Sequence, residues 1–301
     1  MFRGSLVLII FLVCIKSFAQ DPTPIASFPF EKDQQYQIKI LKLKVNYEIN
    51  KDLVILNHIT DLAFIYKDWE TVIEFQQELI IQDPSASHYF ILGAAAGFRA
   101  LKVSPFSSFS YVKLMKLSFL KSFEIDPTNL NVLKAQVDVY ASLPGFLGGD
   151  IEIALKYVRK IKNLNIVEGL IAEAEIYEKI KQADQAALLY KDVFREIKTT
   201  FLSCSFFRKY LKSSRRDLGY DLGRIAADYK LENDLAECAL DYFASTYEMK
   251  DTIPEAWVFY QQARIAIVLK GSEASKKFIL KALLLQPKFP EVLELKEKLN
   301  L

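Results

Sequence analysis

Residues able to carry out catalysis are sparse in this chain. The only histidines, His58 and His88, lie far apart, and no Gly-x-Ser-x-Gly, His-Glu-x-x-His or phosphate-loop pattern occurs. A histidine-dependent triad or a Cys/His zinc site is therefore not expected. Glu173 and Glu175 are two positions apart in a helical pattern, where their side chains diverge and cannot act as a pair. We predict no enzymatic activity, no cofactor and no metal site.

One glycine pair precedes a helical pattern and resembles an anion-binding turn. Gly148 and Gly149 permit positive φ, and Asp150 can cap the following helix. The same arrangement could bind a phosphate at the helix N-terminus. Because no Gly-Lys-Ser/Thr pattern and no strand accompany it, we favour a structural turn.

Two cysteines remain once the N-terminal segment with Cys14 is set aside. Cys204 and Cys238 could form a disulfide in an oxidising compartment. Cysteines on apolar helical patterns also serve as small buried hydrophobic residues. The sequence leaves both possibilities open.

The elements that position these residues are best seen between Glu255 and Pro287. Trp257 and Tyr260 open one helical pattern of apolar residues, and a second pattern follows a turn at Gly271. Neither helix can bury its apolar stripe alone, so the two must pack on each other and on a neighbour.

The order of residue types in this unit resembles the tetratricopeptide repeat (TPR): an early aromatic, small residues in mid-helix, a glycine turn and a closing proline. Asp83-Pro84 and Asp126-Pro127 occupy the same closing place upstream, and Leu92-Gly93 matches the Leu-Gly pair of the first TPR helix. The resemblance implies an all-α fold, a right-handed superhelical array of antiparallel helix pairs (a TPR-like α-solenoid). It also implies that Gly93 lies at a tight helix contact.

The expected organisation has three parts. Residues 1–19 are a signal peptide, residues 20–52 a lead-in with a possible extra helix, and residues 53–301 a solenoid of about six helix pairs with a C-terminal capping helix. Pro105 should break the first helix of the second pair and leave a longer loop. The stretch from Thr199 to Arg216 is irregular and basic, which is typical of a solvated face or of a patch for an acidic partner.

The N-terminus has the pattern of a secretory leader. Arg3 is followed by the apolar run Leu6–Ile15, and small residues at Ser17 and Ala19 predict cleavage before Gln20. An uncleaved anchor and a lipid anchor on Cys14 are the alternatives. Cleavage predicts an exported protein in the periplasm or cell envelope, without stable membrane insertion.

The charge balance excludes some partner classes. The formal net charge of +2 falls to zero when Arg3 and Lys16 leave with the leader. Nucleic acid and an anionic membrane surface are therefore not expected as the main partner.

The TPR resemblance implies a concave groove lined by the first helix of each pair, in which a protein or peptide binds. Aromatic and arginine residues, the usual anchors of binding surfaces, concentrate late in this register. The candidate partner-binding residues are Tyr220, Arg224, Trp257, Tyr260 and Arg264. Packing of Trp257 and Tyr260 against the preceding helix, and pairing of both arginines with nearby acids such as Asp228, are the competing interpretations.

Two functions are consistent with this sequence. The first is an exported, non-enzymatic scaffold for protein–protein interaction. The alternative is a periplasmic solute-binding or transporter-associated protein. It is suggested by the turn from Leu143 to Asp150, which resembles a Pro–Gly-Gly-Asp turn of some exported TPR proteins, including a component associated with some TRAP transporters.

Overall fold

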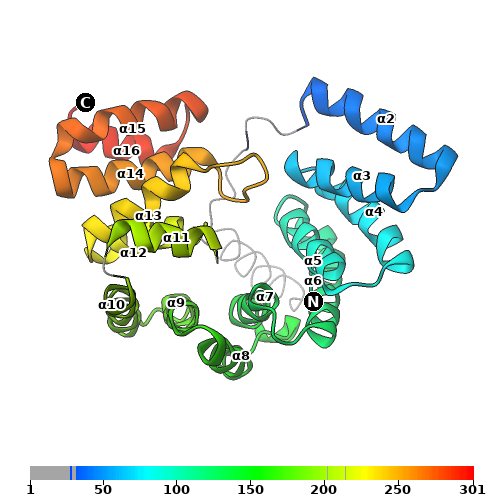
Figure 1. Cartoon of the computed structure of the whole chain (residues 1–301), viewed down its shortest axis with the longest axis horizontal. Helices are drawn as coiled ribbons and strands as arrows, with labels where there is room; N and C mark the ends of the chain where they lie inside the picture. The colour runs from blue at the N-terminus through cyan, green and yellow to red at the C-terminus, as the bar shows by residue number, and fades with distance from the viewer. Residues whose placement is uncertain (1–27, 29–31, 202, 214) are drawn as a thin grey trace, which may run out of the picture. The chain divides into compact units, whose positions relative to one another are not determined.

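The computed structural model describes residue 28 and residues 32–201, 203–213 and 215–301. In these ranges every element of regular secondary structure is a helix (Figure 1). The fold-class prediction of an all-α array of antiparallel helix pairs is confirmed. Two compact units are formed, with residues 32–182 in the first and residues 183–301 in the second. The predicted signal peptide lies outside the described residues. No described helix is long and apolar enough to span a membrane.

The first unit consists of helices joined by short connections. They are α2 (Gln34–Asn50), α3 (Leu53–Ile65), α4 (Trp69–Gln82), α5 (Ala86–Ala100), α6 (Pro105–Ile125), α7 (Leu130–Ser142), the 3-10 helix η1 (Gly145–Leu147), α8 (Ile151–Leu164) and α9 (Ile166–Lys179). Consecutive helices pack as the pairs α3–α4, α5–α6 and α7–α8. Side-chain caps from Asp52, Asp68 and Asp150 begin α3, α4 and α8, because each carboxylate accepts a hydrogen bond from a backbone amide of the first turn.

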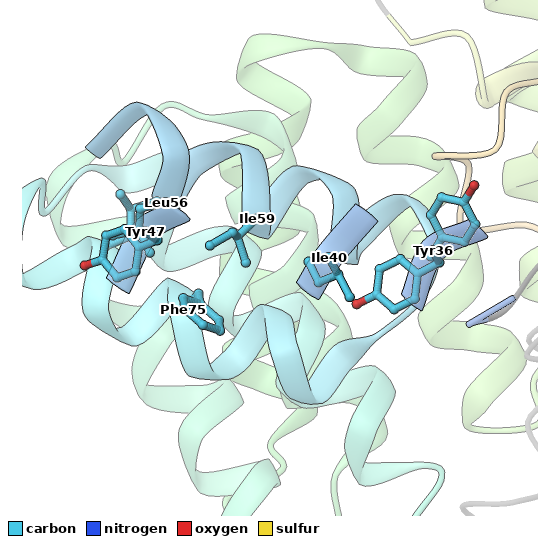
Figure 2. Packing of buried hydrophobic residues seen from close by; sticks show 8 residues of the cluster. Tyr36, Ile40, Tyr47, Leu56, Ile59 and Phe75 are labelled. Carbon is cyan, nitrogen blue, oxygen red and sulfur yellow. The ribbon is translucent and has the colours of Figure 1, made fainter. Parts of the chain in front are cut away.

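The extra helix allowed for at the N-terminus is present as α2. Tyr36, Ile40 and Tyr47 recur at helical spacing on α2 and are buried. Figure 2 shows these side chains against Leu56 and Ile59 of α3 and Phe75 of α4, and together they form one hydrophobic cluster. The core of the first pair therefore continues onto α2.

Gly93 lies where the TPR resemblance places it, at the contact between α5 and α6. A Cβ atom at this position would approach Cδ1 of Phe119 to 2.6 Å. The absence of a side chain therefore lets the two helices approach closely.

The connection within the second helix pair differs from the predicted long loop. Pro105 does not interrupt a helix but begins α6, and Ser104 caps it by accepting a hydrogen bond from the Ser107 amide. Proline is tolerated at the first helical position because that amide has no intrahelical partner. The extra residues of this repeat therefore lengthen α6, and the expected long loop shrinks to residues 101–104.

The turn between α7 and α8 is closed by its own backbone. The amides of Leu147, Gly148, Gly149 and Asp150 all donate to backbone carbonyls, those of Pro144, Gly145, Pro144 and Tyr140 respectively. A Cβ atom on Gly149 would clash with the Leu143 carbonyl oxygen. All four amides are thus used within the turn, which favours the structural interpretation of the glycine pair.

The second unit contains α10 (Ala183–Thr200), α11 (Cys204–Ser213), α12 (Leu218–Tyr229), α13 (Asn233–Ser245), α14 (Glu255–Lys270), α15 (Ser272–Leu285) and α16 (Pro290–Lys298). The pairs α12–α13 and α14–α15 pack tightly, and α16 packs on α15 as the last helix of the described chain (Figure 1). Gly271, with φ of +85°, makes the turn between α14 and α15 that its position in the sequence predicted.

The stretch expected to be irregular contains a helix of its own. Phe207 and Leu211 are buried on one face of α11, and Cys204 at its start forms a disulfide with Cys238 of α13. The disulfide resolves the two alternatives that the sequence left open. A ten-residue helix is marginal alone, so the cross-link and this small apolar face hold it in place.

Candidate functional site

The two arginines proposed for partner binding converge on one carboxylate of the second unit. Arg224 Nη1 lies 3.4 Å from Asp228 Oδ2 on the same helix, α12, and Arg264 Nη1 of α14 lies 2.7 Å from Asp228 Oδ1. The side chains of Arg224, Arg264 and Asp228 are 23 %, 24 % and 37 % exposed. This α12–α14 surface therefore carries two guanidinium groups around one carboxylate, with all three groups in reach of solvent.

Helix geometry explains this convergence. Arg224 and Asp228 are separated by four residues and lie on the same face of α12. Helix α14 packs against α12 and brings in Arg264, whose guanidinium also donates to Oε1 of Gln261 at 3.0 Å. Gln261 is buried, so it holds the Arg264 guanidinium from the core side. The Arg264 side chain remains partly exposed to solvent.

Tyr190 of α10 is a further member of this group. Arg224 Nη2 donates to the Tyr190 hydroxyl at 3.5 Å. Sequence reasoning missed Tyr190 and Gln261 because both are buried and neither belongs to the expected ladder of groove residues. For Gln261 the available signal was its position three residues before Arg264 on one helix face.

Tyr220 is placed in the core. Only 4 % of the residue is exposed, and its ring packs edge-on against Phe243 of α13, with centroids 6.3 Å apart. Burial raises the pKa of its hydroxyl well above the ordinary value. The structure therefore gives Tyr220 a packing role beneath the α12–α14 surface, which differs from the exposed groove position that the sequence predicted.

Trp257 and Tyr260 are half-buried and share one neighbour. The ring centroid of Phe289, just before α16, lies 4.7 Å from that of Trp257 and 5.6 Å from that of Tyr260. Tyr260 also carries the Arg264 guanidinium over its ring at 5.5 Å. Both aromatic residues thus pack in the α14–α16 core, and Tyr260 links that core to the arginine group.

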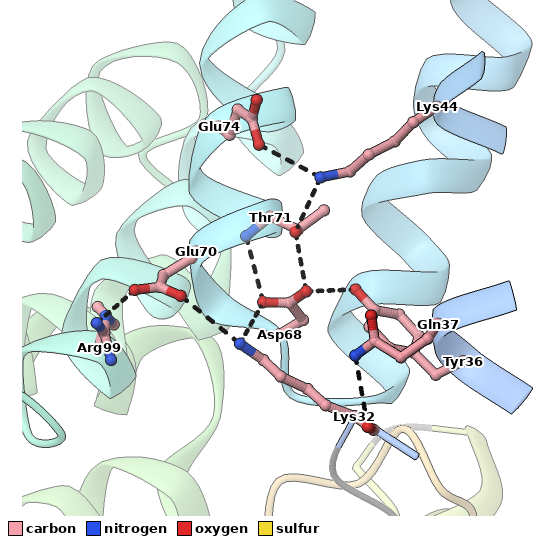
Figure 3. A network of polar contacts seen from close by, with 9 residues as sticks. All are labelled: Lys32, Tyr36, Gln37, Lys44, Asp68, Glu70, Thr71, Glu74 and Arg99. Carbon is pink, nitrogen blue, oxygen red and sulfur yellow. Dashed lines mark hydrogen bonds and ion pairs between the residues drawn. The ribbon is translucent and has the colours of Figure 1, made fainter. Parts of the chain in front are cut away.

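A second polar cluster, in the first unit, is a structural network (Figure 3). Asp68 at the start of α4 accepts hydrogen bonds from the Tyr36 hydroxyl at 2.5 Å and the Thr71 hydroxyl at 2.8 Å, and pairs with Lys32 at 2.9 Å. Lys44 of α2 extends the network through Thr71 to Glu74.

The pKa values of this network point away from acid–base catalysis. Burial raises the pKa of the Asp68 carboxyl, but the hydrogen bonds from Tyr36, Lys32 and Thr71 outweigh it and leave the pKa lowered. Burial and the Asp68 carboxylate raise the pKa of Tyr36 far above its ordinary value. The pKa values of both groups therefore lie far from neutral pH, where a general acid or base must exchange its proton. Among the described residues, no group of three or more His, Cys, Asp or Glu side chains is placed to bind a metal ion.

Comparison with known proteins yields similarity in structure only. No family model and no curated protein matches the sequence. The solved structures that are similar to this chain include the following two. A tetratricopeptide repeat protein from Parabacteroides merdae has 11 % identity and a TM-score of 0.49, and the match covers 97 % of this chain and 99 % of that protein. Pseudomonas aeruginosa PilF has 14 % identity and a TM-score of 0.44, with 88 % and 98 % covered. The solved structures to which this chain is similar thus include TPR proteins, the family that its sequence resembles.

Proposed function

We propose that this protein is an exported, non-enzymatic scaffold of the periplasm or cell envelope, and that it binds a protein or peptide segment at the α12–α14 surface. The observation that carries the proposal is the convergence of Arg224 and Arg264 on Asp228. Arginine beside an aromatic ring is a frequent anchor of protein interfaces, and here Arg264 lies over Tyr260.

The charge of this group defines the ligand chemistry. Two guanidinium groups lie around one carboxylate, and all three groups are partly exposed. The planar guanidinium presents its donors in a fork that matches a carboxylate. We therefore expect the bound segment to present at least one carboxylate to Arg224 or Arg264, alongside an apolar group on Tyr260.

Export is supported by two independent features. The leader pattern around Arg3 and the run Leu6–Ile15 is that of a secretory signal. The disulfide between Cys204 and Cys238 belongs to oxidising compartments and is rare in the cytosol. N-terminal sequencing of the protein from envelope fractions should begin at or near Gln20, and recovery of the intact Met1 form from cytosol would contradict export.

A neutral variant separates partner binding from internal pairing. Reversing both arginines to glutamate would put three carboxylates together, so we choose Arg224→Gln, Arg264→Gln and Asp228→Asn combined, which removes every charge without adding repulsion. We expect this triple variant to keep its helical content and to lose partner capture roughly tenfold or more, which corresponds to about 1.4 kcal/mol. Asp228→Asn alone keeps both guanidinium groups and should retain capture.

The capture itself is measured by site-specific cross-linking. A benzophenone amino acid in place of Tyr260 should form cross-linked products in envelope preparations, and the same group in place of Leu280, an exposed residue of α15, serves as the matched control. If the triple variant cross-links as well as the wild type, the arginines have structural roles alone and the proposed surface is wrong.

A further inference from the structure

Helix α2 has two apolar faces on opposite sides. Tyr36, Ile40 and Tyr47 form the buried face against α3 and α4. A second stripe runs along the opposite face, at the spacing of three and four residues that keeps side chains in line. Its members are Ile38, Leu41, Val45 and Ile49.

The outer stripe is exposed to solvent. Between 52 % and 76 % of each of these four residues is accessible. The stripe is about 16 Å long, from the rise of 1.5 Å per residue between Ile38 and Ile49. The solvent-facing side of a helix is normally polar. The outer side of α2 has the opposite character, and a continuous exposed apolar stripe marks an interaction site.

The charges around the stripe indicate what covers it. Lys42 and Lys39 lie along one edge, both exposed, and neither forms an ion pair with any described residue. The other edge carries Glu48, which is already paired with Lys51. Helix α2 contains three lysines and one glutamate. Lys44 pairs with Glu74 of α4, so Lys39 and Lys42 make the helix locally cationic although the mature chain is expected to be neutral.

We propose that the outer face of α2 lies on an anionic lipid surface. Aliphatic side chains that enter the acyl boundary and lysines that meet the headgroups are the two components of an interfacial helix. No shape-matched cleft is needed, because the membrane is a continuous surface. The net charge of the whole chain predicted no such partner, because a sum over all residues hides the local excess of positive charge on α2.

A second copy of the chain fits this face less well. Two α2 helices packed antiparallel through their stripes would bring the Lys39–Lys42 edge of one against the same edge of the other. No carboxylate of α2 lies on that edge to separate the charges, since Glu48 is on the opposite one. The repulsion therefore favours a lipid surface over this antiparallel dimer.

The test uses the exported form, which we expect to begin at Gln20 and which retains every described residue. Its binding is measured by co-sedimentation with vesicles of phosphatidylcholine containing about one quarter phosphatidylglycerol, and with vesicles of phosphatidylcholine alone. We expect roughly tenfold tighter binding to the anionic vesicles, weakened by added salt. Equal binding to both vesicle types, or none to either, overturns the proposal.

Matched double variants locate the contact. Leu41→Ser with Val45→Ser should lower vesicle binding roughly tenfold, because it removes half of the stripe. Leu280→Ser with Leu284→Ser removes an exposed aliphatic pair of the same spacing from α15 and should leave binding unchanged. Equal loss in both variants would show that the contact is not specific to α2.

Two further readouts distinguish lipid insertion from adsorption by charge alone and from pairing with a second copy of the chain. Val45→Trp should show emission shifted to shorter wavelength with anionic vesicles, which adsorption by charge alone does not produce. Sedimentation equilibrium should find a monomer. A dimer that Leu41→Ser with Val45→Ser dissociates, together with no vesicle binding, assigns the face to a second copy and overturns the proposal. Capture at the α12–α14 surface is measured separately and does not depend on this outcome.

Discussion

The Tyr36 hydroxyl of α2 donates a hydrogen bond of 2.5 Å to the Asp68 carboxylate, which also caps α4 (Figure 3). One side chain thereby attaches the N-terminal helix to the first helix pair, since Asp68 serves both elements. The bond is buried, so water does not compete for either partner. The attachment of α2, and with it the position of its outer stripe, depends on this contact as well as on the apolar cluster below it.

Tyr36→Phe should therefore destabilise the first unit. The change keeps the ring that stacks on Tyr66 and removes the hydroxyl alone. A hydrogen bond to a charged acceptor contributes roughly 1.5–3 kcal/mol, and we expect a loss in that range in the free energy of unfolding. Urea unfolding followed by Trp69 fluorescence, in a Trp257→Phe background, reports on the first unit. Tyr242→Phe, whose hydroxyl bonds no described residue, is the control, and equal effects of the two changes would contradict the role of this bond.

The same network predicts how stability depends on pH. The folded pKa of Asp68 is lowered below its ordinary value of 3.8, so its ionised form stabilises the fold above that value. This contribution is lost as pH falls through the folded pKa. The stability gap between the wild type and Asp68→Asn should stay constant from neutral pH to about pH 5 and narrow below about pH 4. Asp61→Asn, at an exposed position, controls for general acid effects. A gap that widens on acidification would reverse the sign that we derive.

Sequence reasoning predicted those parts of the fold in which local pattern and packing agree. The helical spacing of Trp257 and the turn at Gly271 were sufficient for α14 and α15, because an amphipathic stripe and a glycine with positive φ each allow few structures. Pro105 was misjudged because a proline that breaks one helix can equally begin the next, and only the cap from Ser104 decides between them. Helix α11 was missed because ten residues are too few to show a clear helical period, and the sequence left its disulfide as one of two alternatives.

The candidate site was predictable in composition but not in arrangement. Arg224 and Arg264 were identified from register, and their pairing with Asp228 was weighed as a competitor, since a spacing of four residues on a helix is a local rule. Tyr220 was expected at the surface and is buried, because a shift of one residue turns a side chain through more than a quarter of the helix circumference. Contacts between distant segments, such as Arg224 with Tyr190, follow from tertiary packing alone.

Gly93→Leu tests the contact between α5 and α6. The side chain would overlap the ring of buried Phe119, and overpacking of this kind costs roughly 1–3 kcal/mol in the free energy of unfolding. Gly145→Leu is the matched control, because no atom lies within 4 Å of a Cβ there and its φ is not positive. We expect that control to change stability by less than about 0.5 kcal/mol. Phe119→Ala should partly relieve Gly93→Leu in a double-mutant cycle, and strict additivity would contradict the contact.

The disulfide between Cys204 and Cys238 should stabilise the second unit by an amount that the length of its loop predicts. It joins residues separated by 34 positions, and a cross-link of that span restricts the unfolded chain by about 3–4 kcal/mol in the loop-entropy model. Cys204 is exposed, so a reductant reaches the bond in the folded protein. Urea unfolding of the second unit, followed by Trp257 fluorescence in a Trp69→Phe background, should therefore shift to lower urea when dithiothreitol is added. Cys204→Ser with Cys238→Ser should match the reduced wild type and show no response to dithiothreitol.

The protein isolated from the envelope should contain no thiol that reacts with maleimide, and two reactive thiols in that preparation would refute both the cross-link and the support that it gives to export.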